Sequence, residues 1–195
     1  MHDLKLITTT DLPTPMGVFR LAAFSAEDSD DEHLALIHGN IAQTDNCTVR
    51  VHSECLTGEV FGSQRCDCRE QLEAAMSFIS KQPSGVLIYL RQEGRGIGLL
   101  NKLRAYRLQD EGIDTIEANQ YLGFPADARN YRAAASILEL LEVRSVSLLT
   151  NNPDKIEGLR AAGIDVTSRI SLVPSENPHN RSYLETKRSK MGHLL

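Results

Sequence analysis

Three of the four cysteines lie close together in the segment CLTGEVFGSQRCDC, where Cys55, Cys66 and Cys68 could together hold a metal ion. The single residue between Cys66 and Cys68 lets two thiolates from one turn reach the same ion, and Cys55 adds a third from the end of the preceding strand. Zinc favours such thiolate ligands. The spacing therefore indicates a zinc site.

The spacing does not decide the role of this site. Three cysteines without an evident fourth ligand are typical of a catalytic zinc, whose bound water ionises near neutral pH. A structural zinc completed by His52 or by a distant residue fits the same spacing, and so does a chain without metal. Cys47 is expected in the core, because it shares the apolar side of the alternating segment CTVRVHS with Val49 and Val51.

A second candidate site is the glycine turn in YLRQEGRGIGLLNKL, which contains Gly94, Gly96 and Gly98. Glycines let the backbone approach a ligand, and the helix start that follows offers free N–H groups to an anion. The turn matches neither the P-loop nor the GxGxxG pattern. A guanidinium suits phosphate and a carboxylate suits the N–H edge of a base such as guanine, so Arg95 and Glu93 are the favoured ligand-binding residues.

Several other cations accompany this turn in an otherwise acidic chain: Arg91, Lys102, Arg104 and Arg107. Arg91 precedes the turn, and the other three extend the positive charge along the helix that follows the glycines. The last three also fit a basic helix face that is simply solvated. The sequence alone leaves both interpretations open for them.

The chain has 195 residues and a formal net charge of −5, which argues against a nucleic-acid partner, because such proteins carry a surplus of Lys and Arg. No apolar run approaches the roughly 20 residues of a membrane span. The start, MHDLKLITTT, lacks the apolar stretch of a secretory signal. We therefore expect a cytoplasmic protein without membrane contact, in which thiols stay reduced.

The elements that must position these residues follow from periodicity. Short β-rich segments fill the first third, and strands alternate with amphipathic helices afterwards. We expect strands at 17–24, 33–39, 47–53, 86–90, 145–150 and 165–168, and helices at 69–81, 99–111, 127–142 and 151–163. The acidic segment 26–33 is expected to be a solvated loop.

These elements predict a mixed α/β architecture, with a β-rich N-terminal third and βα units after it. The final strand–helix–strand segment is one crossover, which implies parallel pairing of its two strands. We expect a single compact domain over residues 1–195.

Four long segments in the same order resemble the signature segments of GTP cyclohydrolase II, the first committed enzyme of riboflavin synthesis. They are RVHSECLTGEVFGSQRCDC, RQEGRGIGLLNKLRAY, LGFPADARNY and LLTNNPDK. The resemblance implies a catalytic zinc on Cys55, Cys66 and Cys68, Mg²⁺ bound with the triphosphate of GTP, and a homodimer. The implied reaction opens the imidazole ring of guanine with release of formate and pyrophosphate. The implied product is 2,5-diamino-6-(5-phosphoribosylamino)pyrimidin-4(3H)-one.

The resemblance also implies roles for single residues, matched position by position. Asp127 takes the place of a proton acceptor, Arg129 that of a nucleophile at the α-phosphate, and Tyr106 that of a tyrosine involved in ring opening. The implied GTP contacts are Arg50, Val51, His52, Ser53, Glu54, Gln71, Glu93, Gly94, Arg95, Thr115, Thr150 and Lys155.

Local sequence offers a plainer interpretation of several of these residues. Asp127 stands where an N-cap of the following helix would be, and Tyr106 lies at a helix position that is often core. Thr150 and Lys155 flank a turn where solvated residues are common. Arg129 could clamp a phosphate while water attacks, because a guanidinium is almost always protonated.

Two residues near the cysteines depart from the family pattern: Glu59 stands where Asp is common, and Arg69 where Gly is common.

Two other functional classes are alternatives to the cyclohydrolase. A zinc deaminase would carry H-x-E and P-C-x-x-C, and neither occurs here. A nucleotide-binding module with a structural zinc would show four evident ligands.

Overall fold

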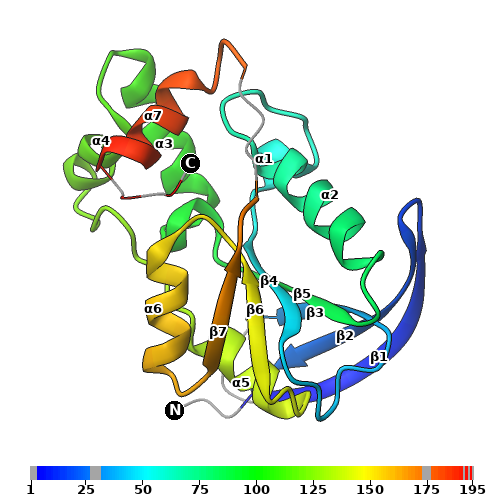
Figure 1. Ribbon diagram of the computed structural model, residues 1–195. Coiled ribbons are helices and arrows are strands. Elements are labelled where there is room, and N and C mark those ends of the chain that lie inside the picture. Colours follow the sequence, from blue (N-terminus) through cyan, green and yellow to red (C-terminus); the bar gives the residue numbers. More distant parts are fainter. Residues whose placement is uncertain (1–3, 27–31, 173–176, 191, 193, 195) are drawn as a thin grey trace.

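The computed structural model describes residues 4–26, 32–172, 177–190, 192 and 194, whose strands form one mixed sheet of seven strands (Figure 1). The order across the sheet is β1-β2-β3-β5-β4-β6-β7. The strands are β1 (Lys5–Thr14), β2 (Gly17–Ser25), β3 (Glu32–His38), β4 (Cys47–Ser53), β5 (Gly85–Leu90), β6 (Ser145–Leu149) and β7 (Asp165–Ile170).

The pairing changes direction in the middle of the sheet. Strands β1, β2, β3 and β5 pair antiparallel, whereas β4 pairs parallel with both β5 and β6, and β6 pairs parallel with β7. The expected parallel crossover is thus confirmed in β6 and β7. Because the carboxyl ends of parallel strands share one edge, the loops after β4, β5 and β6 are brought together there.

Helices cover both faces of the sheet (Figure 1). One core packs α5 and α6 against the strands and contains Cys47, as expected from its alternation. A second core packs α2 against the other face, with Ala75 and Ile79 buried. The helices are α1 (Leu56–Glu59), α2 (Cys68–Ile79), α3 (Gly98–Asp110), α4 (Thr115–Tyr121), α5 (Arg132–Leu140), α6 (Pro153–Ala161) and α7 (Arg181–Lys190), with a single turn η1 (Glu93–Gly96) before α3.

The polar side of β4 is also buried. Thr48, Arg50 and His52 are all at most 8% exposed, because β4 is central and α2 lies over it. The side chains of Arg50 and His52 are therefore buried, and both lie toward the carboxyl end of β4. The mixed α/β class expected from the sequence is confirmed, and β1, α1, α4 and α7 are additional elements.

One expected helix boundary is wrong. Helix α5 begins at Arg132 with Tyr131 as its N-cap, so Asp127 does not cap it. Asp127 Oδ1 instead accepts a hydrogen bond of 3.0 Å from the backbone N–H of Arg129. This local turn competes with helix formation and delays the helix start.

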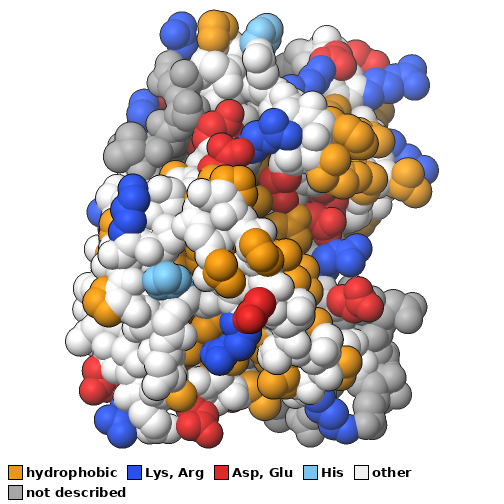
Figure 2. All heavy atoms as spheres, turned by 90° about the vertical axis from the view of Figure 1, so that its right-hand side faces the viewer, with side chains coloured by type: hydrophobic (Ala, Val, Ile, Leu, Met, Phe, Trp, Pro, Cys, Tyr) orange, Lys and Arg blue, Asp and Glu red, His pale blue; other side chains and the backbone are white. Residues whose placement is uncertain are grey.

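Two remaining expectations concern the outer surface. Residues 27–31 of the acidic segment lie outside the described part of the chain. Among the described residues, no helix is long and apolar enough to cross a membrane. Acidic and basic side chains are interspersed over the face shown in Figure 2.

Candidate active site

The candidate site lies at the carboxyl ends of β4, β5 and β6. The chain leaves β4 at Ser53 and reaches Cys55, leaves β5 and enters the glycine turn, and leaves β6 at Thr150. The exit from β4 leads to the three cysteines, the exit from β5 leads to Arg95 and Lys102, and the exit from β6 leads to Lys155. The parallel core of the sheet therefore positions the chemistry.

The three cysteines form one cluster. The sulfur atoms of Cys55, Cys66 and Cys68 lie within 4.8 Å of one another, and the Cys55 and Cys66 sulfurs are 3.6 Å apart. Tetrahedral zinc–thiolate bonds of about 2.3 Å place sulfurs roughly 3.8 Å apart. Among the described residues, no further metal-ligating side chain joins the group. The donor set fits a zinc ion with an open fourth position.

Electrostatics in the cluster favour a bound cation. The pKa of Cys55 is lowered, because its neighbours Cys66 and Cys68 hydrogen-bond to its sulfur. That interaction raises the pKa of Cys66 to about 11 and raises that of Cys68 well above its ordinary value. A bound dication would offset the repulsion between neighbouring thiolates, because it places positive charge among the three sulfurs.

Gly58 makes room for this cluster. A Cβ atom there would lie 2.9 Å from the Cys66 sulfur and 3.2 Å from the Cys55 sulfur. Gly58 sits in the single-turn helix α1, which follows Cys55 directly. A side chain at this position would push the thiolates apart.

Replacing Gly58 with Ala is therefore expected to weaken zinc binding by about 5- to 150-fold, since overpacking costs about 1–3 kcal/mol. Metal analysis after dialysis against a chelator measures it. Gly158→Ala is the matched control, because its Cβ would overpack against the Tyr131 ring at 2.6 Å, away from the thiols. Equal zinc content in Gly58→Ala and wild type would contradict the expectation.

Lys102 is a member of the site that the sequence did not single out. Its ammonium Nζ lies 3.1 Å from the Cys55 sulfur and 2.8 Å from Glu93 Oε1, and the residue is 9% exposed. The interpretation of Lys102 as part of a solvated helix face is wrong. Arg104 and Arg107 are exposed, as a solvated face requires. No local pattern separates Lys102 from Arg104 and Arg107, because the packing around the helix decides which of them is buried.

Glu93 is buried and already accepts three hydrogen bonds. Its carboxylate accepts from the backbone N–H groups of Leu56 and Gly94, both at 2.7 Å, and from Lys102. These bonds connect the glycine turn to the residue that follows Cys55. Gly94 takes a positive φ of 63°, as this tight connection requires.

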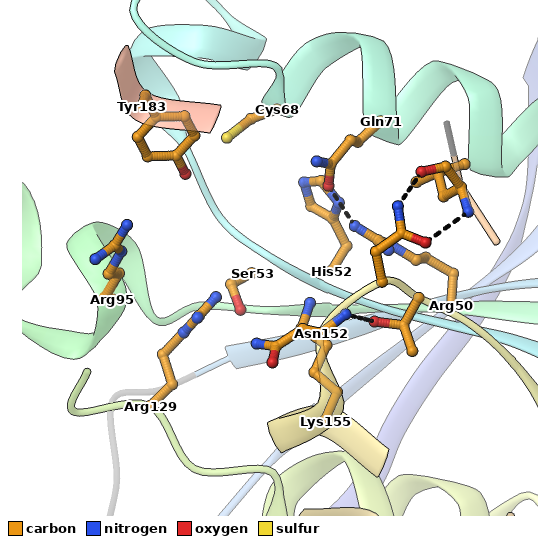
Figure 3. Close-up of a pocket in the computed structure, with 13 residues that line it drawn as sticks. Arg50, His52, Ser53, Cys68, Gln71, Arg95, Arg129, Asn152, Lys155 and Tyr183 are labelled. Carbon is orange, nitrogen blue, oxygen red and sulfur yellow. Dashed lines mark hydrogen bonds between the residues drawn. The ribbon is translucent and has the colours of Figure 1, made fainter. Parts of the chain in front are cut away.

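A cationic cavity adjoins the cysteines. Thirteen residues line it, and they include four cations and no carboxylate. Figure 3 shows that the cations reach it from different elements, with Cys68 at one side. The four are Arg50, Arg95, Arg129 and Lys155. Such a lining suits a polyanion. Each cation has lost part of its hydration by burial, and phosphate oxygens can replace the lost hydrogen bonds to water.

Arg95 is the clearest anion-binding group in this cavity. Both terminal nitrogens of its guanidinium are buried and have no hydrogen-bond partner among the described residues. The residue takes a φ of 62°, a conformation uncommon outside glycine, and its guanidinium lies 5.8 Å from the ring centre of Tyr183. Buried donors without partners are costly. The cavity is therefore built for a ligand that accepts from them.

Asp127 and Arg129 form an ion pair, of which only Arg129 lines the cavity. Arg129 Nε donates to Asp127 Oδ1 at 2.9 Å, and a second guanidinium nitrogen pairs with Oδ2. Burial acts to raise the pKa of Asp127, but hydrogen bonds and charge from Arg129 outweigh it and lower the pKa. The same pair raises the pKa of Arg129 against the opposing effect of burial. Both groups are thus ionised at neutral pH.

Thr150 and Lys155 are buried, so their interpretation as solvated residues is wrong. They are 1% and 5% exposed, and Lys155 Nζ donates to the Val51 carbonyl at 2.8 Å. Asn152 caps α6 by accepting from the Asp154 N–H, which fixes the turn that carries Lys155. The strand-to-helix turn therefore points inward at the site.

Gln71 lines the cationic cavity, and Tyr106 lines a hollow beside the cysteines. Gln71 Oε1 accepts a hydrogen bond from Arg50 at 2.7 Å. Tyr106 lines a second hollow of about 430 Å³ that contains all three cysteines, and its hydroxyl lies 3.3 Å from that of Thr57. Burial raises the pKa of Tyr106 to about 12. Tyr106 is therefore a protonated residue of the cavity wall.

The two hollows adjoin each other, because they share five lining residues. A ligand can therefore contact the thiols and the cations at once, and a volume of this size suits a small molecule. The shared residues are Ser53, Cys68, Arg95, Arg129 and Tyr183. Glu54 also lines the cysteine hollow, whereas the side chain of Thr115 lies outside the described part.

The two departures from the family pattern lie in contact. Arg69 donates to the backbone carbonyl of Glu59 at 2.7 Å and to that of Val60 at 3.1 Å. The Glu59 carboxylate accepts from the Tyr89 hydroxyl at 2.6 Å and lies 2.8 Å from His52 Nε2. Arg69 thus fixes the backbone end of Glu59, whose side chain reaches the buried histidine.

His52 is neutral in the folded protein. Its Nε2 donates to Glu59, so Nδ1 is the basic nitrogen. Burial lowers the pKa of His52 to about 4, although Glu59 acts in the opposite direction.

Lowering the pH from about 6.5 to 4 is therefore expected to decrease stability, because the unfolded chain takes up a proton at His52 more readily than the folded one. The shift from 6.5 to about 4 corresponds to about 3 kcal/mol. Denaturant unfolding at both pH values measures it. His52→Gln should reduce the pH dependence and His38→Gln should not; equal dependence in both variants would contradict this origin.

Comparison with known proteins agrees with this geometry. The family model described as GTP cyclohydrolase II matches residues 5–171. GTP cyclohydrolase-2 of Neisseria meningitidis serogroup B is 53% identical over 98% of this chain and 97% of its own length. GTP cyclohydrolase-2 of Klebsiella pneumoniae is 52% identical over 99% of this chain and 96% of its own length.

Longer relatives match as well. Riboflavin biosynthesis protein RibBA of Bacillus mycoides is 55% identical over the whole of this chain, which spans 50% of that protein. A crystal structure of the two-domain RibBX of A. baumannii aligns over 90% of this chain and 41% of its own, with a TM-score of 0.49 and 17% identity, too low to add to the assignment. The family-model match and the near-full-length relatives place this chain in the GTP cyclohydrolase II family.

Proposed function

We propose that this protein is a zinc-dependent GTP cyclohydrolase II, which opens the imidazole ring of GTP and releases formate and pyrophosphate. The observation that carries the proposal is a three-cysteine cluster that adjoins a cavity lined by four cations and no carboxylate. A nucleoside triphosphate has the matching chemistry, with a base for the metal end and phosphates for the cationic end.

The hollow that contains the three cysteines would be the place where the imidazole ring is opened. Cys55, Cys66 and Cys68 would hold zinc, which when bound activates water for attack on the ring carbon. Tyr106 faces the same hollow with its proton retained, so it can donate a hydrogen bond to the ring or to the opened product. Glu93 keeps the glycine turn in place while Gly94 and Arg95 present backbone and guanidinium to the nucleotide.

The cationic end would bind the phosphates. Arg50, Lys155 and Arg95 lie around the cavity, and Thr150 and Gln71 lie beside them. These groups would stabilise the charge that develops as the α–β phosphate bond breaks. Mg²⁺ is expected to enter with the triphosphate rather than at a site of the protein's own.

Arg129 acts in this proposal as a clamp on the α-phosphate. Its raised pKa and its pairing with Asp127 keep the guanidinium protonated, and a protonated guanidinium has no free electron pair for attack. Asp127 is ionised and can accept a proton from an attacking water. The nucleophile role that the family resemblance implies for Arg129 would require it to lose its proton to Asp127.

The test is incubation of purified protein with GTP and Mg²⁺, followed by assays for formate and pyrophosphate. Both products in equal amounts are expected. A deaminase would release ammonia instead, and a nucleotide-binding module would release nothing. The proposed homodimer and the single domain over 1–195 are tested separately, by light scattering and by limited proteolysis.

A further inference from the structure

Lys102 lies between two anionic groups of the site. Its ammonium is 2.8 Å from Glu93 Oε1 and 3.1 Å from the Cys55 sulfur, and its side chain is 11% exposed. At these distances the ammonium can donate a separate N–H to each group, because it carries three donors. The contact with sulfur is therefore a directed hydrogen bond.

Glu93 explains the position of this ammonium. Its carboxylate is held by the backbone N–H groups of Leu56 and Gly94, so the Lys102 side chain is anchored to a fixed acceptor. Leu56 follows Cys55 directly, and the same carboxylate therefore fixes both the cation and the start of the cysteine turn. The Lys102 ammonium that contacts Cys55 is therefore held by a carboxylate that is itself fixed by two backbone hydrogen bonds.

The contact is specific to one of the three thiolates. Cys66 and Cys68 have no such ammonium contact among the hydrogen bonds of the described residues, although all three sulfurs belong to one cluster. An ammonium bonded to a thiolate draws electron density from its sulfur, so that ligand donates less to a bound metal. Three thiolates on a dication leave a charge of −1, and the Lys102 ammonium offsets part of the combined negative charge of this centre and of Glu93.

We infer that Lys102 is a positioning residue of the metal centre, which holds the Cys55 thiolate and weakens its donation so that bound zinc remains a strong Lewis acid. This inference rests on the proposed zinc site. In this inference Lys102 acts through its hydrogen bond to Cys55.

The test uses cobalt(II) in place of zinc, because thiolate-to-cobalt charge-transfer bands report electron donation by sulfur. Lys102→Met keeps the length of the side chain and removes the donor. The expected result is a shift of the charge-transfer band to longer wavelength. Arg107→Met is the matched control, since it removes a cation from the same helix where the side chain is 86% exposed, and its band should coincide with wild type.

Each outcome decides the inference. Coincident bands in Lys102→Met and wild type, with one cobalt bound in each, would overturn it. If Lys102→Met does not fold, Lys102→Gln is measured with the same two outcomes. Folded variants that bind no cobalt would overturn the tuning role and assign Lys102 to site formation. If the wild-type protein binds no cobalt, the metal centre itself is contradicted, and with it the proposed function.

Discussion

Replacing Cys66 with Ser is expected to abolish formate release from GTP while pyrophosphate release continues, leaving GMP as the product. Cys66 lines only the cysteine hollow, whereas the cationic cavity retains Arg50, Arg129 and Lys155 in this variant. The thiolate cluster loses one of three ligands, which removes the metal that ring opening requires. Chromatographic product analysis measures both reactions in one sample.

Two variants control this experiment. Cys47→Ser should keep its zinc and both reactions, because Cys47 is 1% exposed in the core and belongs to no metal cluster of the described residues. Arg129→Ala should lose pyrophosphate release while keeping zinc. Circular dichroism confirms folding of each. A folded Cys66→Ser protein that releases no pyrophosphate would show that the two reactions depend on each other.

Replacing Arg95 with Met is expected to weaken GTP binding on the order of 10- to 100-fold. The two terminal guanidinium nitrogens have no partner among the described residues, so a phosphate would be their acceptor. Hydrogen bonds to charged groups contribute about 1.5–3 kcal/mol, and each 1.4 kcal/mol is tenfold in affinity. Titration calorimetry with GTP measures it, using protein whose metal content has been verified.

Stability gives Arg95→Met a second readout. Removing two buried N–H donors that have no hydrogen-bond partner among the described residues should leave the free energy of unfolding unchanged or raise it, because an unsatisfied buried donor destabilises the ligand-free protein. Arg104→Met is the control, an exposed cation on α3 bonded to Asn101, and should bind GTP as wild type does. Unchanged GTP affinity in Arg95→Met would show that the cavity serves another ligand.

The sequence determined most of the elements and the metal ligands. Alternation in 47–53 identified β4 and placed Cys47 in the core, and helical spacing in 69–81 identified α2. Both are local patterns, because side chains on one face repeat every two residues in a strand and about every 3.6 in a helix. The close spacing of Cys66 and Cys68 is likewise local, so their shared turn could be inferred without a fold.

The tertiary structure decided which charged residues belong to the site. Lys102, Thr150 and Lys155 look like surface residues in the sequence, yet all three are at most 9% exposed. Their burial depends on strands that are distant in sequence: β4 lies between β5 and β6, and that pairing draws the three loops to one edge. Burial of a charge is a property of what packs around it, which local patterns do not contain.

The same reason accounts for Asp127 and for the contact between Glu59 and Arg69. Local sequence favoured a helix cap at Asp127, but the ion pair with Arg129 formed a turn instead. Glu59 and Arg69 are ten residues apart, and only the folding of α1 against α2 brings the guanidinium onto the Glu59 carbonyl. Short-range preferences set the elements, whereas ion pairs and hydrogen bonds between elements set the geometry of the site.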